Sequence, residues 1–477
     1  MINQRAVTVL GVCAALLAAM CAGCGHTVLA GRAVSMLYDP DRVGGLPVTD
    51  GPSGPRGEVP PVTDRVDNSD DGDMDRLALL AVDDIENYWT QHYSESLSGT
   101  FKPVGTLMSY DSRNPNGPPV CGAKMYRQPN AMYCYRADTM AWDRGKFLPT
   151  AKKYFGTMAI NGTLAHEYGH AVQRMAGLAG RLTSTLVKEQ QADCLAGVYL
   201  QWVAAGGSAR DTLSTGDGLN HVLAGLIVIR DPISTPGAEV PGGDEHGTAL
   251  DRVGAFQIGF DGGAQACAGI DRSEIRRRRG NLPAALFDSA NQQSDTDIDD
   301  GILSTLMGQL GQIFAPADPP KLSTSLADCR SRREGMPSAY CPESNTVAVD
   351  LPALRQLGAP SDESETGLPQ GDNTALSVVV SRYALAVQHQ RGADLNSAKA
   401  ALRTACLTGV AQRRMAEPGG PLMLGGGDLD EAITGLLLNG FAASDVDGDT
   451  VPSGFTRILA FRSGLHGSID QCFQRFG

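Results

Sequence analysis

Residues 166–170 read His-Glu-Tyr-Gly-His, the pattern H-E-x-x-H, and these side chains could do hydrolytic chemistry. Residues four apart lie on one face of a helix, so His166 and His170 can offer two imidazole nitrogens to one metal ion. Glu167 follows the first histidine and can act as general base on a water that the metal activates. The alternative is a helix that carries two solvated histidines, and the apolar residues around the pair argue against it.

A hydrolytic zinc site also needs a third protein ligand and an open fourth position. Glu189 is far enough beyond His170 for the first helix to end near residues 177–180 and for a second helix to return antiparallel. Asp193 lies one helical turn after Glu189 and can accept the second ring N–H of a ligand histidine, which fixes its tautomer. A solvated acidic helix face is the alternative, but residues 192–202 are too apolar to be mostly surface.

These segments resemble a known group of enzymes. The runs AHEYGHAVQ and EQQADCLAGV are similar to the neutral zinc metallopeptidases, which belong to the HExxH-plus-Glu zincins. Residues 121–134 and 246–267 also fit that family, and the order of the segments resembles actinobacterial lipoprotein peptidases of the LpqM type. The resemblance covers residues 75–270 and implies a zinc hydrolase fold, but it names no substrate.

Each matching residue then has an expected role. We expect His166, His170 and Glu189 to hold zinc, and Asp193 to orient a ligand histidine. Glu167 would take a proton from the attacking water and pass it to the leaving amine.

Side-chain types alternate along residues 131–143 enough to predict a strand. This interpretation places Arg136 and Asp138 on one face, and Tyr133 and Tyr135 on the other. In zincins, an edge strand beside the active helix pairs with an extended substrate, and we expect this segment to play that part. An ordinary sheet strand is the alternative.

The first residues of the chain predict export. Arg5 precedes an apolar stretch of small residues, 6–22, which is typical of a secretory signal peptide. Small residues also precede Cys24, so we expect Cys24 to be lipidated and to become the new N-terminus. Ordinary secretion without a lipid is the alternative. A lipid-modified Cys24 would hold the protein at the outer face of the cytoplasmic membrane.

Composition agrees with an exported protein. The net charge of -13 argues against nucleic-acid binding and against adhesion to anionic lipid. Residues 24–73 are rich in Gly, Pro and Asp, and we interpret them as a flexible spacer. The length of the remaining chain favours two domains.

The second part of the sequence repeats the first. Residues 166–173 align with 381–388, and 194–198 align with 406–410. Cysteines and small residues are kept in both copies, which indicates that the fold needs them. The proposed metal set is lost as a group: His166, Glu167, His170, Glu189, Asp193 and His246 become Ser381, Arg382, Leu385, Ala401, Ala405 and Val451. The second copy is therefore predicted to be a degenerate, inactive repeat.

The loss of His246 with the metal set makes this residue our candidate for stabilising the negative oxygen that forms during hydrolysis. Its His-Gly-Thr setting precedes a helix, so a structural hydrogen bond at that helix start is an equal alternative.

Eight cysteines follow Cys24, and an even number in an exported chain favours four disulfides. Cysteine as a zinc ligand is the alternative, but the sequence has no CxxC pair. Each copy has two close and two distant cysteines, so we expect pairing within each copy. The predicted disulfides are Cys121–Cys134, Cys194–Cys267, Cys329–Cys341 and Cys406–Cys472.

Together these features predict an α+β, mainly helical protein with a tandem duplication of a zincin-like domain. The expected parts are a lipoprotein signal peptide (1–23), a spacer (24–73), an active repeat (74–272) and a degenerate repeat (273–477). The expected function is that of a lipid-anchored zinc metallopeptidase acting on a peptide or protein in the cell envelope. The rival hypothesis is a zinc-stabilised envelope scaffold without catalysis, and the presence of Glu167 argues against it.

Overall fold

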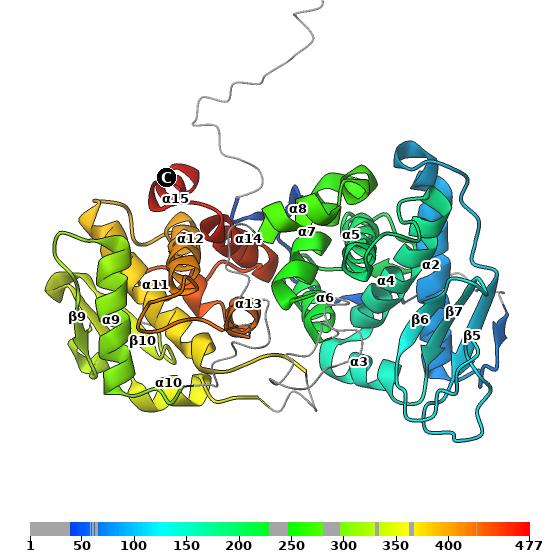
Figure 1. Ribbon diagram of the computed structural model, residues 1–477, viewed down its shortest axis with the longest axis horizontal. Coiled ribbons are helices and arrows are strands. Elements are labelled where there is room, and N and C mark those ends of the chain that lie inside the picture. The colour runs from blue at the N-terminus through cyan, green and yellow to red at the C-terminus, as the bar shows by residue number, and fades with distance from the viewer. Residues whose placement is uncertain are drawn as a thin grey trace, which may run out of the picture. The chain divides into compact units, whose positions relative to one another are not determined.

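The computed structural model describes residues 39–57, 59, 62, 65–228, 247–279, 296–329, 333–361, 367–425 and 427–477 (Figure 1). These residues belong to one compact unit, Met36–Gly477. The predicted signal peptide, Cys24 and His246 lie outside the described residues. Within the described part, no helix is both long and apolar enough to cross a membrane. The elements confirm the predicted α+β, mainly helical fold class.

The first half contains a small sheet of four strands in the order β4-β5-β7-β6. Its strands are β4 (Val66–Asp67), β5 (Thr106–Tyr110), β6 (Ala131–Cys134) and β7 (Thr139–Asp143). β5 runs parallel to β7, whereas β6 forms an antiparallel hairpin with β7, in which Tyr133 lies opposite Met140. Trp142 of β7 donates from its indole Nε1 to Asp75 of helix α2 (Asp73–Ser96) at 2.8 Å, which fastens the sheet to that helix.

The described part of the first half has six further helices: α3 (Phe147–Phe155), α4 (Thr157–Ala176), α5 (Thr185–Ala204), α6 (Asp217–Val228), α7 (Ala249–Ala268) and α8 (Arg272–Arg279). α4 ends at Gly177, whose φ of 64° is the left-handed conformation that glycine adopts readily. α5 then runs antiparallel to α4. The contacts show this direction: His166, earlier in α4, contacts Asp193, later in α5, whereas Gln173 contacts Lys188. The predicted antiparallel pair of helices is therefore present.

The second half has the same succession of elements. Its sheet has the order β10-β11-β9, in which β9 is parallel and β10 antiparallel to β11, as β5 and β6 are to β7. The elements are α9 (Asp300–Phe314), β9 (Lys321–Ser323), β10 (Ser338–Cys341), β11 (Thr346–Val349), α10 (Leu351–Leu357), α11 (Asp372–Gln390), α12 (Ala398–Met415), α13 (Asp428–Leu438), α14 (Gly454–Leu465) and α15 (Ile469–Arg475). This order agrees with our interpretation that the chain is a tandem duplication.

The two halves also share the way in which their long helices touch. A Cβ on Gly259 of α7 would overlap the carbonyl of Cys194 on α5, and a Cβ on Gly464 of α14 would overlap the carbonyl of Cys406 on α12. Glycine is needed at these positions because the backbones approach closely. The cysteines are paired as the sequence predicts, with Cα–Cα distances of 5.2 to 5.8 Å: Cys121–Cys134, Cys194–Cys267, Cys329–Cys341 and Cys406–Cys472.

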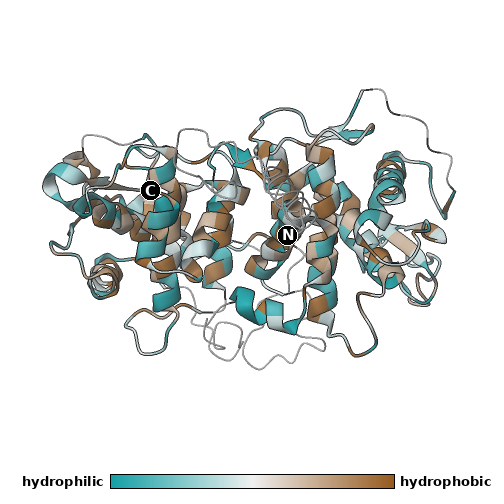
Figure 2. Ribbon diagram, turned by 90° about the horizontal axis from the view of Figure 1, so that it is seen from above, coloured by the Kyte–Doolittle hydropathy of each residue, from teal (hydrophilic) through white to brown (hydrophobic). Residues whose placement is uncertain are grey.

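The halves meet through α6 and α7 on one side and α13 and α14 on the other, near the centre of Figure 1. The ring centroids of Phe260 and Phe455 are 5.2 Å apart, and Gln257 donates from Nε2 to the carbonyl of Phe455 at 2.9 Å. Buried apolar residues of both halves form one continuous core, and Figure 2 shows hydrophobic segments on these central helices. The two halves therefore share a core.

Residues 39–57, which belong to the predicted spacer, pack on the folded part. Strand β3 (Gly54–Pro55) pairs with β8 (Asp211–Thr212), and the N–H of Thr49 donates to Thr215 Oγ1 at 2.8 Å. Val43 is buried in the common core. This stretch is therefore structured, because its few apolar and hydroxyl side chains find partners that are distant in sequence.

Candidate metal centre

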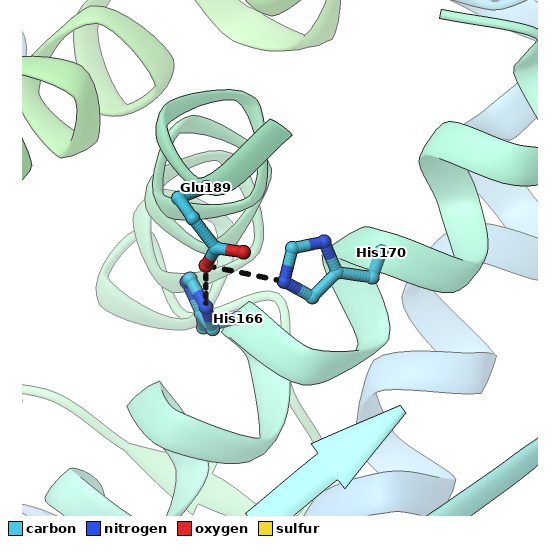
Figure 3. Close-up of side chains that lie close together, drawn as sticks. All are labelled: His166, His170 and Glu189. Carbon is cyan, nitrogen blue, oxygen red and sulfur yellow. Dashed lines mark ion pairs between the residues drawn. The ribbon is translucent and has the colours of Figure 1, made fainter. Parts of the chain in front are cut away.

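Three predicted ligand side chains converge between α4 and α5 (Figure 3). Nε2 of His166 lies 3.2 Å from Oε2 of Glu189, and Nε2 of His170 lies 3.4 Å from the same oxygen. The ligand atoms of the three residues are all within 4.8 Å of one another. Two imidazole nitrogens and one carboxylate oxygen form the donor set of a hydrolytic zinc site.

Close packing of the two helices allows Glu189 to reach the histidines. Gly169 lies between His166 and His170 in the chain, and a Cβ there would lie 2.9 Å from the carbonyl oxygen of Ala192 on α5. A larger residue at position 169 would push α5 away from α4. The glycine inside the H-E-x-x-H pattern therefore helps to bring the third candidate ligand close.

Asp193 holds His166 from the side opposite the metal position. Its Oδ1 accepts from Nδ1 of His166 at 2.8 Å and from Nη2 of Arg252 at 2.7 Å, and all three side chains are buried. Burial alone would lower the pKa of His166, but Asp193 and Glu189 outweigh it and raise the pKa to about 10. The surroundings thus stabilise positive charge at this point, and a metal cation fits there in place of the proton.

Glu189 shows the complementary behaviour. Burial raises the pKa of this carboxyl, but its hydrogen bonds with His166 and His170 outweigh burial and lower the pKa. Glu189 is therefore a carboxylate, the form that binds a metal ion.

The centre is closed on one side and open on the other. The His166 side chain is 2% exposed, whereas those of His170 and Glu189 are 19% and 12% exposed. His170 and Glu189 line a cavity of about 930 Å³, so a ligand in this cavity would reach the open side of the donor set. The other lining residues are Tyr133, Tyr135, Arg136, Gln173, Arg174, Ala179, Gly180, Arg181 and Lys188.

Glu167 contacts the edge of the sheet. Its Oε2 accepts a hydrogen bond of 3.0 Å from the backbone N–H of Tyr133 on β6. Burial raises the pKa of Glu167, although His166 and His170 act in the opposite direction. A carboxylate with a raised pKa is a better proton acceptor, which suits a general base.

The strand predicted over residues 131–143 is two strands, so that prediction was wrong in extent. β6 and β7 are joined by a turn in which Asp138 has a φ of 48°. The Tyr133 hydroxyl donates to Oδ1 of Asp138 at 2.6 Å, which shows that these residues do not point to opposite faces. β6 does lie at the edge of the sheet and next to Glu167, as we expected for the substrate-binding strand.

The second half fills the equivalent position with protein. Arg382, which takes the place of Glu167, is buried and donates from Nη2 to Ser444 Oγ at 2.6 Å and to the Phe441 carbonyl at 2.8 Å. Burial lowers the pKa of this guanidinium to about 10. Among the described residues, the other group with metal-binding spacing is all-carboxylate and comes from Asp372, Asp428 and Glu431.

The structure thus brings together five predicted site residues: His166, Glu167, His170, Glu189 and Asp193. Two partners of these residues were not predicted from the sequence: Arg252 and the backbone of Tyr133. An arginine within an apolar helix is a signal that a buried acid is near, but Arg252 was given no role in the predicted site. The backbone of Tyr133 gives no sequence signal.

Comparisons with known proteins agree with this site. Residues 7–269, more than half of the chain, match the family described as "Putative neutral zinc metallopeptidase". The chain is similar to "Uncharacterized protein YpfJ" of Escherichia coli (strain K12), with 30% identity over 217 residues, 42% of this chain and 71% of YpfJ. It is also similar to "Uncharacterized protein Rv2575" of Mycobacterium tuberculosis (strain ATCC 25618 / H37Rv), with 32% identity over 124 residues, 23% of this chain and 42% of Rv2575. No solved structure matches significantly. The match and the geometry show that the chain belongs to the neutral zinc metallopeptidase family.

Proposed function

We propose that the protein is a zinc-dependent metallopeptidase that hydrolyses peptide bonds at the site in its first half. The observation that carries this proposal is the convergence of His166, His170 and Glu189 beside an open cavity, with Glu167 next to them. A purely structural zinc site is usually closed by four protein ligands and needs no general base. The open side and Glu167 therefore favour catalysis over the rival scaffold function.

The side chains divide the work of hydrolysis. Zinc held by the three ligands supplies Lewis acidity, which makes water nucleophilic near neutral pH. Asp193 keeps the proton of His166 on Nδ1, so that Nε2 presents a lone pair to the ligand position. Glu167 takes the proton of the attacking water and gives it to the leaving amine. His246 remains the sequence-based candidate for stabilising the negative oxygen.

The edge of β6 is the proposed place for the peptide backbone. The N–H of Tyr133 points away from β7 toward Glu167, and in an antiparallel strand the carbonyl of the same residue points to the same side. An extended substrate could pair with this edge and enter the adjoining cavity.

The proposed location is the outer face of the cytoplasmic membrane, with lipid on Cys24. Four cysteine pairs within bonding distance support an oxidising compartment, because such bridges persist outside the cytoplasm. The substrate would then be a peptide or protein of the cell envelope.

The variant Glu167→Gln tests the function. We expect it to keep zinc, because residue 167 is not a ligand, and to lose peptide cleavage by at least about 100-fold, because it cannot accept a proton. Zinc content by atomic absorption and cleavage of a quenched fluorescent peptide library would be measured on the same preparations. Cleavage by Glu167→Gln at the rate of the unmodified protein would contradict the mechanism.

A further inference from the structure

The cavity beside the metal centre is lined by positive charge. Four cations line it, namely Arg136, Arg174, Arg181 and Lys188. Among the described residues that line it, the one acidic side chain is that of the candidate ligand Glu189. The chain as a whole has a net charge of -13, so a cationic cavity runs against the overall composition. A concave surface lined by one sign of charge concentrates ligands of the opposite sign.

Most of this positive charge is available to a ligand. Arg174 donates to the Asp138 carboxylate at 2.9 Å and to the Tyr133 hydroxyl at 2.7 Å. In the part of the chain that the structure describes, no acidic side chain pairs with Arg136, Arg181 or Lys188. Unpaired cations around an open cavity point to a negatively charged partner rather than to a role in folding.

The second half provides an internal comparison. There, the Tyr340 hydroxyl contacts Asn345 at 3.0 Å and His389 at 2.9 Å, which matches the contacts of Tyr133 with Asp138 and Arg174. Arg174 corresponds to His389, because residues 166–173 of this helix align with residues 381–388. The fold of this corner is thus kept in both halves, whereas the charge is not.

Two more cations change in the same comparison. Arg136 corresponds to Glu343, because each lies two residues after a paired cysteine of its hairpin. Lys188 corresponds to Ala400, because each precedes the position of Glu189 and Ala401. Three of the four cavity cations are thus replaced in the second half together with the metal ligands, as expected if they serve the reaction and not the fold.

We propose that this cavity binds carboxylate groups of the substrate, so that the enzyme selects peptides that place a carboxylate in it. The proposal rests on the peptidase function proposed above and gives its substrate class. Arginine forks and the lysine ammonium form charge-assisted hydrogen bonds with carboxylates. The carboxylates come either from Asp and Glu side chains or from the C-terminal end of the peptide.

Binding of three fluorescein-labelled peptides tests the proposal on the zinc-loaded full chain of Glu167→Gln, which we expect to hold peptides without cleaving them. The first peptide has two Glu residues in an Ala and Phe background, the second has Gln instead, and both are amidated. The third is the Gln peptide with a free C-terminal carboxylate. Fluorescence anisotropy at low and high salt gives each Kd.

We expect the Glu peptide or the free-acid peptide to bind about tenfold more tightly than the amidated Gln peptide, and which of the two does so identifies the source of the carboxylate. The preference should fall at high salt, because exposed charges are screened. The double variant Arg136→Gln/Lys188→Gln should lose most of the preference for the carboxylate-bearing peptide. The matched control Lys152→Gln/Arg276→Gln removes two exposed cations outside the cavity lining and should keep the preference.

Equal binding of all three peptides would overturn the proposal, and so would a preference that survives in the cavity double variant. Thermal unfolding of each variant checks that its fold is intact. The conservative variant Arg136→Lys keeps the positive charge and should keep the preference. Cleavage of the same peptides by the unmodified protein is measured separately. A carboxylate preference in binding with no cleavage of any peptide would contradict the peptidase function and leave the substrate-binding cavity supported.

Discussion

At the scale of single residues, the sequence predicts well which side chains meet when they lie on the same helix or on two consecutive helices. His166, Glu167 and His170 share a helix, and Glu189 and Asp193 share the next, so helical periodicity and the short connection between the two helices place them. Arg252 comes from a helix much further along the chain. Its contact with Asp193 depends on how three helices pack, and short-range patterns do not contain that information.

Asp211 is a buried carboxyl group outside the metal centre, and it contacts helix α4. Asp211 is 2% exposed and accepts a hydrogen bond of 2.9 Å from Nδ2 of Asn161 on α4. Burial, and then the negative charge of Asp84, raise the pKa of Asp211 to about 6 from the ordinary 3.8. Because the folded-state pKa is the higher one, the stabilising contribution of Asp211 is complete below pH 3.8 and is lost as the pH rises through 6.

The variant Asp211→Asn should therefore be more stable than the unmodified protein above pH 6, by up to about 3 kcal/mol, because asparagine has no charge to bury. Below pH 4 the two proteins should have nearly the same free energy of unfolding. Urea unfolding at pH 4 and at pH 7.5 measures this difference. An equal difference at both pH values would show that Asp211 does not titrate as described.

At the scale of elements, the sequence predicted the paired helices but not the hairpin. Residues 131–143 alternate like one strand, yet Asp138 adopts a positive φ and the chain reverses there. Aspartate tolerates that conformation without the Asn-Gly or Asp-Gly signal that usually marks a hairpin. The turn was therefore not visible, although the position of the strand beside the active helix was.

The contact between α5 and α7 can be tested by adding one methyl group. Gly259→Ala should lower the free energy of unfolding by about 1–3 kcal/mol or more, because its Cβ would overlap the Cys194 carbonyl. The same change at Gly308, which lies exposed on α9 with open space around it, should raise stability by about 0.5–1 kcal/mol. Urea midpoints of both variants measure the effects, and similar midpoints would contradict the close helix approach.

At the scale of the whole molecule, the sequence predicted two repeats and left open whether they share a core. The face between them is built from side chains such as Phe260 and Phe455, which look like ordinary core residues of each repeat. The packing of residues 39–57 was also missed, because their Gly- and Pro-rich composition is typical of a linker. Long-range contacts of this kind become visible only in the folded chain.

A shared core predicts that the repeats unfold together. Phe455→Ala, in the second half, should destabilise the protein by about 3–5 kcal/mol. The three tryptophans, Trp89, Trp142 and Trp202, all lie in the first half, so their fluorescence reports the unfolding of that half alone. We expect the tryptophan transition to shift to lower urea concentration in this variant.

Leu438→Ala is a control in the same half. Because the Leu438 side chain is 57% exposed, this variant should change the urea midpoints little. A tryptophan transition that stays in place in Phe455→Ala, while the circular dichroism transition moves, would mean that the repeats fold independently.

The most direct measurement is the zinc content of the purified protein, with His166→Ala beside it. We predict about one zinc ion per chain, because the first half has the ligand set and the second half has Ser381 and Leu385 in place of the histidines. His166→Ala should lose this zinc while staying folded. A chain without zinc, or zinc that remains bound in His166→Ala, would contradict the assignment of the metal centre.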